Sequence, residues 1–177
     1  IFFKKLLPSV LSSGVTQINI LIGTIIASFE AGAVSYLYYA DRIYQINLAI
    51  AGIAVGTISL PVLSKAYKNK NITQLSNIQN KSFELSLLLS IPASLGLILA
   101  SNEIVNALFG YGSFSIKDVT MTADTLKYFG FGVPAFALIK ILSNFFFARN
   151  NTKTPFYISL FIVIINITIS LSFFPTV

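Results

Sequence analysis

The chain has 177 residues, of which 55% are hydrophobic and only 10% are charged, and its mean hydropathy is +0.79. Soluble domains carry about a quarter of their residues as charged types, so this composition predicts a protein that folds in a lipid bilayer. The absence of cysteine and histidine excludes disulfides, Cys/His zinc sites, thiol nucleophiles and histidine acid–base catalysis, and we expect no enzyme, no cofactor and no metal site.

Apolar stretches predict five membrane-spanning helices, because one span needs about 20 apolar residues. In chain order they cover residues 6–28, 33–63, 82–100, 123–148 and 155–174. The second stretch is longer than a bilayer requires, which indicates a tilted helix or one that extends beyond the hydrocarbon. A Lys/Asn-rich polar segment at 64–81 and a looser region before residue 123 connect the inner spans. We therefore expect an all-α, polytopic transmembrane helix bundle.

The charges of the connections predict the orientation of the spans. Basic residues lie before the first span, between the second and third, and between the fourth and fifth: Lys4, Lys5, Lys65, Lys68, Lys70, Lys81, Arg149 and Lys153. The alternate connections carry Glu30, Glu103, Lys117, Asp118 and Asp124. Under the positive-inside rule this pattern places the start of the chain in the cytoplasm. Membrane anchoring thus explains most of the net charge of +6, and we expect contacts with membrane lipids and none with nucleic acid.

Ionisable residues inside the predicted spans are candidate functional residues, because a charge in a bilayer is costly and usually faces a bundle interior or a watery cavity. Asp41 and Arg42 lie in the second span, where helix neighbours point about 100° apart and cannot neutralise each other. Arg42 shares a helix face with Tyr38, Tyr39 and Gln45. One interpretation is that both charged side chains reach the membrane interface, where tyrosines are common. In the other, Arg42 projects into a cavity and binds an anion, since guanidinium pairs bidentately with phosphate.

In that second interpretation, Asp41 orients Arg42 or pairs with a cation on a neighbouring helix. Lys140 in the fourth span is a further candidate because it lies well short of Arg149, and its alternative role is snorkelling or pairing within the bundle. Proline inside a span, as at Pro92 and Pro134, frees a carbonyl and bends the helix. The small residues of 52–56 (Gly-Ile-Ala-Val-Gly) predict a close approach by another helix.

Three stretches together resemble the MurJ/MviN family of lipid II flippases, within the multidrug/oligosaccharidyl-lipid/polysaccharide exporter superfamily. They are residues 38–45 (YYADRIYQ) continuing through 52–64 (GIAVGTISLPVLS), residues 108–114 (LFGYGSF), and residues 132–136 (GVPAF) with 140–142 (KIL) and 147–155 (FARNNTKTP). Pro8 and residues 17–19 are also similar to the helix that precedes these stretches in the family.

The resemblance implies a fourteen-helix, two-lobe transporter of the bacterial cytoplasmic (inner) membrane, in which residues 1–177 form part of the C-terminal lobe, spans seven to eleven. It implies that the complete protein flips lipid II, the undecaprenyl-diphosphate-linked peptidoglycan precursor, by alternating access. Arg42 matches a cavity arginine that the family assigns to the diphosphate, Asp41 matches the acid beside it, and Lys140 matches a recurrent lysine of no assigned role. With Gln45 they form the expected substrate-binding set.

The expected partner is an N-terminal lobe of the same transporter, because the chain starts at Ile1 and is expected to be the inside of a longer protein or a truncated copy of one. Tyr111 stands where many relatives have arginine, and Asn47 and Ala49 stand where many have proline and glycine, which predicts a softer kink after Arg42. Two alternatives stay open: an exporter of the same superfamily that moves a polysaccharide-lipid, a drug or a cation, and a non-functional membrane fragment.

Overall fold

A computed structural model describes residue 14 and residues 17–173, and throughout that part of the chain the regular elements are helices. Four described helices are long and apolar enough to cross a membrane: Ala33–Lys68, Ile72–Leu99, Ile116–Ala148 and Lys153–Ser170. A shorter apolar helix, Gln17–Ala27, is the described part of the predicted first span. The all-α bundle expected from the composition is confirmed. Lys4, Lys5 and Pro8 lie outside the described residues.

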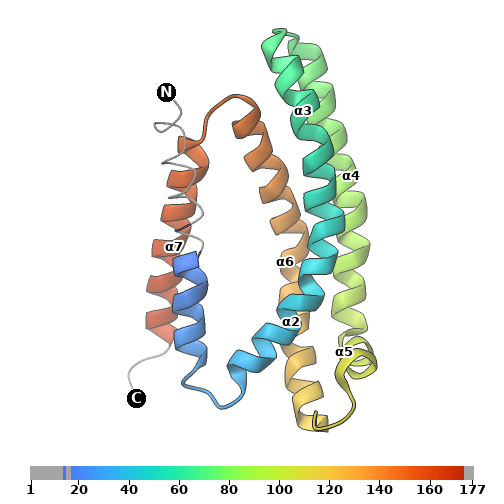
Figure 1. The fold of residues 1–177 in the computed structure, drawn as a ribbon, viewed down its shortest axis with the longest axis vertical. Helices are drawn as coiled ribbons and strands as arrows, with labels where there is room; N and C mark the ends of the chain where they lie inside the picture. The colour runs from blue at the N-terminus through green and yellow to red at the C-terminus, as the bar shows by residue number, and fades with distance from the viewer. Residues whose placement is uncertain (1–13, 15–16, 174–177) are drawn as a thin grey trace. The chain divides into compact units, whose positions relative to one another are not determined.

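The elements in chain order are α2 (Ala33–Leu48), the π-helix η1 (Ala49–Ala54), α3 (Val55–Lys68), α4 (Ile72–Leu99), α5 (Ser101–Phe109), α6 (Ile116–Ala148) and α7 (Lys153–Phe173). One helical path runs through α2, η1 and α3 (Figure 1). The chain divides into two compact units. Residues 35–149, with most of α2 and all of η1 to α6, form the unit that holds the candidate site, and the other unit contains the Gln17–Ala27 helix and α7.

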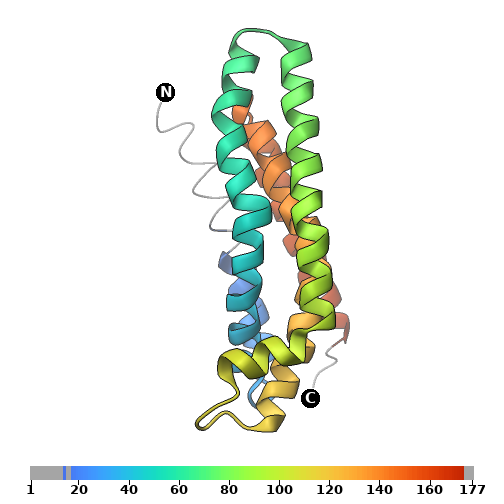
Figure 2. The same cartoon turned by 90° about the vertical axis from the view of Figure 1, so that its right-hand side faces the viewer.

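The segment 64–81, expected as a polar connection, is helical except for residues 69–71. It forms the tip of a hairpin in which α3 and α4 lie side by side (Figure 2). Leu63 of α3 is buried in a cluster against which Leu75 and Ile78 of α4 pack. The Asn71 side chain accepts a hydrogen bond from the backbone N–H of Gln74 at 2.9 Å and so caps α4. Asn69, Lys70 and Asn71 therefore form the turn, and the other lysines and asparagines of this segment are exposed on the two helices.

A capping box starts α6 earlier than the expected residue 123. The Ser115 hydroxyl accepts a hydrogen bond from the backbone N–H of Asp118 at 3.2 Å, and the Asp118 carboxylate accepts one from the backbone N–H of Ser115 at 2.8 Å. The Tyr36 hydroxyl of α2 also donates to the Asp118 carboxylate, at 3.0 Å. The looser region expected before the fourth span thus consists of α5, a short turn and the first turns of α6.

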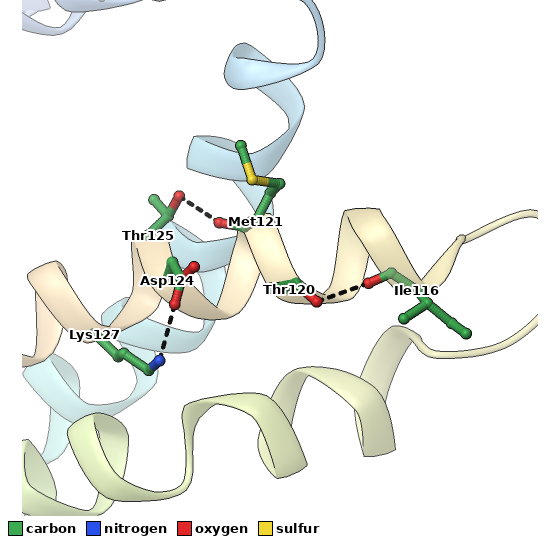
Figure 3. A network of polar contacts seen from close by, with 6 residues as sticks. All are labelled: Ile116, Thr120, Met121, Asp124, Thr125 and Lys127. Carbon is green, nitrogen blue, oxygen red and sulfur yellow. Dashed lines mark hydrogen bonds and ion pairs between the residues drawn. The ribbon is translucent and has the colours of Figure 1, made fainter.

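The polar side chains drawn in Figure 3, which follow Asp118 along α6, bond within their own helix. Lys127 Nζ pairs with Asp124 Oδ1 at 2.8 Å, and both side chains are about half exposed. The Thr125 hydroxyl donates to the carbonyl of Met121 at 2.8 Å. Because these partners are three or four residues apart on one helix, they stabilise α6 locally and connect it to no other element.

Two serines of α4 donate hydrogen bonds to irregular points of the neighbouring helices. Four buried serines recur at every fourth position: Ser82, Ser86, Ser90 and Ser94. Ser94 Oγ donates at 2.7 Å to the carbonyl of Gly130, which Pro134 leaves without its helical N–H donor. Ser86 Oγ donates at 2.9 Å to the carbonyl of Ala51 in η1. Side-chain donors from α4 therefore satisfy carbonyls in the two irregular segments, as an apolar environment requires.

Glycines let α6 approach the α2–η1–α3 path closely, as the small-residue pattern predicted. A Cβ on Gly52 would lie 3.1 Å from Cα of Ala137, and a Cβ on Gly56 would lie 2.5 Å from Nδ2 of Asn144. The later glycine meets the later residue of α6, so the α2–η1–α3 path and α6 run in the same direction. The basic α3–α4 turn and the end of α6 consequently lie at one end of this unit, and α5 and the start of α6 lie at the other (Figures 1 and 2).

Candidate functional site

Two faces of α2 have opposite environments. Ala40, Ile43 and Tyr44 are buried within their own unit, and the Tyr44 ring stacks on Phe129 of α6 with 5.4 Å between centroids. Arg42 is exposed, because at about 100° per residue it lies about 200° around the helix from Tyr44. The predicted anion-binding residue therefore points away from the core of its unit.

Tyr38 lies one turn before Arg42 and contacts its guanidinium in two ways. Arg42 Nη2 donates to Tyr38 Oη at 2.6 Å, and Arg42 Cζ lies 4.6 Å from the centroid of the Tyr38 ring. Over the residues that the structure describes, the one ion pair is Lys127–Asp124, so no carboxylate there neutralises Arg42. The Tyr38 ring covers one face of the guanidinium.

Asp41 bonds to Gln45 and not to Arg42. The Gln45 side-chain amide donates to the Asp41 carboxylate, one turn away on the same helix. Asp41 is half-buried and Gln45 is exposed. The expectation that adjacent Asp41 and Arg42 do not pair is met by this geometry. The amide partner is a third arrangement, different from the two roles that the sequence suggested for the carboxylate.

An aromatic cluster of Tyr38, Tyr39, Phe109 and Phe114 joins α2 to the α5–α6 connection. The Tyr39 ring lies 4.8 Å from the Phe109 ring and 5.3 Å from the Phe114 ring, and Tyr38 meets Tyr39 edge-on at 6.2 Å. Sequence reasoning missed this cluster. The only signal was the density of aromatic residues in 36–39 and 109–114, and nothing in the sequence pairs these two segments.

Lys140 lies apart from Arg42. It is exposed on α6, one turn before Asn144, which faces Gly56 near the start of α3. Since Lys140 lies one turn before Asn144, it is level with a point one turn before Gly56 on the α2–η1–α3 path. That point is about ten residues beyond Arg42, or roughly 15 Å at about 1.5 Å per residue. The structure therefore brings Asp41, Arg42 and Gln45 together on one helix and leaves Lys140 at a different depth of the same unit.

This arrangement can bind a phosphate group through Arg42. The guanidinium has two edges that each present two N–H donors, Nε with Nη2 and Nη1 with Nη2. Nη2 points one hydrogen toward each edge, so the single hydrogen bond to Tyr38 leaves the other edge complete. A complete edge binds carboxylate or phosphate oxygens bidentately. Among the described residues there is no group of three or more His, Cys, Asp or Glu side chains that could hold a metal ion.

Comparisons with known proteins identify the setting of this site. A family model described as "Lipid II flippase MurJ" matches residues 1–177. A "Probable lipid II flippase MurJ" of Rickettsia prowazekii is 46% identical over 172 residues, which cover 95% of this chain and 34% of that protein. A "Lipid II flippase MurJ" of Burkholderia cenocepacia is 35% identical over 174 residues, which cover 98% of this chain and 34% of that protein.

A solved structure shares the fold. The structure described as "Lipid II flippase MurJ, inward closed conformation" matches with a TM-score of 0.81 and 30% sequence identity, over 89% of this chain and 33% of that chain. The chain thus spans about a third of the length of the proteins that it matches.

Proposed function

This chain belongs to the lipid II flippase MurJ family, and we propose that it forms part of a transporter that flips lipid II across the bacterial inner membrane. One observation carries the proposal: Arg42 is exposed on a helix long and apolar enough to cross a membrane, and among the described residues it has no carboxylate partner and keeps a complete double-donor edge. The undecaprenyl diphosphate of lipid II supplies the anion that such an edge recognises.

The energetic argument favours a binding role for Arg42. An arginine at the centre of a membrane helix costs about 2.5 to 3.5 kcal/mol on insertion scales, and such residues usually face a bundle interior or a water-filled cavity. Arg42 points away from the core of its own unit, so we propose that it faces a cavity completed by other parts of the transporter. Asp41 and Gln45 shape the polar surface beside it through their hydrogen bond.

We propose that the chain works with an N-terminal lobe and not alone. Alternating access requires two lobes that move against each other, and the chain corresponds to about a third of its relatives. The charges support a cytoplasmic location for the α3–α4 turn, because Lys65, Lys68 and Lys70 lie there while Glu103 and Asp118 lie at the opposite end of the unit. We also propose, from the charges of the sequence alone, that the start of the chain lies in the cytoplasm. The proposed activity is transport and not enzymatic catalysis.

Lys140 has a separate role in this proposal. Lys140 lies on α6 at a level roughly 15 Å from that of Arg42, and we assign it to a different part of the same ligand. The effects of Lys140→Met and Arg42→Ala on ligand affinity are therefore expected to add, since the two side chains lie on different helices and at different levels of the unit.

Complementation tests the proposed function. The complete gene is expressed in bacteria depleted of their own flippase, with membrane levels of each variant checked by immunoblot. Arg42→Ala should abolish rescue, and the control Lys68→Ala, which removes an exposed lysine at the α3–α4 turn, should leave it intact. Normal rescue by Arg42→Ala contradicts the role of Arg42. Failure of the unsubstituted gene to rescue favours a non-functional fragment.

The cargo is tested separately, because related exporters move polysaccharide-lipids, drugs or cations. Proteoliposomes containing the complete gene product are loaded with fluorescent lipid II or with a cationic dye. Family membership favours movement of lipid II and not of the dye. Movement of the dye alone would contradict the proposed cargo and leave the membrane-transport function in place.

A further inference from the structure

Tyr38 contacts Arg42 in two chemically different ways. Its hydroxyl accepts a hydrogen bond from Nη2 at 2.6 Å, and its ring lies under the guanidinium with 4.6 Å between Cζ and the ring centroid. The hydrogen bond to the hydroxyl restricts the position of Nη2, and the ring restricts the orientation of the guanidinium plane. An arginine side chain that is free in solution samples many rotamers, so these two restraints select a small fraction of them before any ligand arrives.

Both restraints come from a neutral group, and this matters for an anion site. A carboxylate partner would hold the guanidinium equally well, but it would cancel the charge that attracts phosphate. The nearest carboxylate along the chain, Asp41, accepts its hydrogen bond from Gln45 instead. Arg42 is therefore held by Tyr38 without losing its charge or its second double-donor edge.

Tyr39, the chain neighbour of Tyr38, packs against another element. The Tyr38 ring meets the Tyr39 ring edge-on at 6.2 Å, and Tyr39 packs against Phe109 and Phe114 at 4.8 and 5.3 Å. Edge-to-face ring pairs at such distances are attractive. The rings of Phe109 and Phe114 thus pack against the segment of α2 that carries Tyr38. Through this packing, the position of Arg42 depends on the turn at 110–115.

We infer that Tyr38 is a positioning residue: it holds the Arg42 guanidinium in the orientation that presents its free edge to a diphosphate. The inference rests on the proposed function, because it assigns the same site a second residue. Tyr38 acts through Arg42 and needs no contact with the ligand.

The experiment measures binding of an isoprenyl diphosphate to the complete gene product in detergent micelles. Tyr38→Phe keeps the ring and removes the hydrogen bond, so it should weaken binding about five-fold. Tyr38→Leu removes both restraints and should weaken binding about ten- to thirty-fold. Tyr128→Phe, at an exposed tyrosine of α6, is the matched control and should bind like the unsubstituted protein. Thermal melting without ligand verifies that each variant is folded.

A double-mutant cycle separates positioning from a general structural role. In the Arg42→Gln background, Tyr38→Phe should change the affinity by less than about two-fold, because the group that it positions is gone. An equal loss in both backgrounds, or no loss from Tyr38→Leu in a folded protein, overturns the inference. If Arg42→Gln itself binds the diphosphate as well as the unsubstituted protein, the proposed function fails as well, and this outcome is distinct from failure of the Tyr38 variants alone.

Discussion

Replacing Ser94 by alanine should destabilise the protein, and the size of the loss should depend on Pro134. Ser94 Oγ donates to the Gly130 carbonyl at 2.7 Å, and Pro134 has no N–H for that carbonyl. Ser94 is buried, and alanine nearly matches its volume, so the substitution removes a hydrogen bond without opening a large cavity. In a Pro134→Ala background the restored N–H can bond Gly130 itself, and Ser94 becomes dispensable.

The magnitude follows from the environment of the carbonyl. Leaving a buried acceptor unpaired costs about 1 to 3 kcal/mol, whereas interhelical hydrogen bonds in membrane proteins average about 0.6 kcal/mol when measured. We therefore expect Ser94→Ala to cost about 1 to 1.5 kcal/mol beside Pro134 and less than about 0.5 kcal/mol beside alanine. Ser82→Ala is the matched control, because Ser82 is a buried serine of the same helix that bonds only to the Ile78 carbonyl within α4.

Equilibrium unfolding of the complete gene product in detergent micelles measures these differences. The four proteins of the Ser94/Pro134 cycle, together with the Ser82→Ala control, are unfolded by denaturant under one set of conditions. A coupling free energy near 1 kcal/mol supports the account. Equal losses from Ser94→Ala in both backgrounds would refute it, because the serine would then not be replacing the donor that proline lacks.

Two further predictions concern the packing and capping of α6. Gly52→Ala should destabilise the fold by about 1 to 3 kcal/mol in the same unfolding assay, since its Cβ would meet the backbone of Ala137, while Gly96→Ala, with open space around its Cβ, should be neutral or slightly stabilising. A neutral Gly52→Ala would contradict the close approach of η1 and α6. Ser115→Ala should remove about 0.5 to 2 kcal/mol of helix capping and speed amide hydrogen exchange in the first turn of α6, with unchanged exchange as the contrary result.

The long helices were predictable because about 20 consecutive apolar residues have few other solutions in a polypeptide. The ends of these helices were harder to predict. The Lys/Asn-rich residues of 64–81 have a polar composition typical of loops, yet buried residues such as Leu63 and Ala66 recur at helical spacing and extend the hairpin beyond the apolar stretch. The π-helix in 49–54 was not predicted: the sequence suggested only a softer kink after Arg42, and the donor that bonds one of its carbonyls, Ser86, comes from a distant helix.

The candidate site was predictable where it depends on neighbours within one helix. An offset of four residues placed Tyr38 on the helix face of Arg42, and the structure forms that hydrogen bond. The bond of Gln45 to Asp41 has the same offset. Contacts between distant segments were not available from one sequence. The packing of Tyr39 on Phe109 and the separation of Lys140 from Arg42 depend on how α2, α5 and α6 are arranged. The expectation that these residues bind substrate stays a prediction.

The most direct test of the central claim is the rate at which lipid II crosses proteoliposome membranes containing the complete gene product. Arg42→Ala and Lys68→Ala each remove one positive charge, the first from the candidate site and the second from the α3–α4 turn. The account predicts that Arg42→Ala reduces translocation to the protein-free rate while Lys68→Ala leaves it unchanged. Equal, undiminished rates for the two variants would contradict the assignment of Arg42 to the diphosphate.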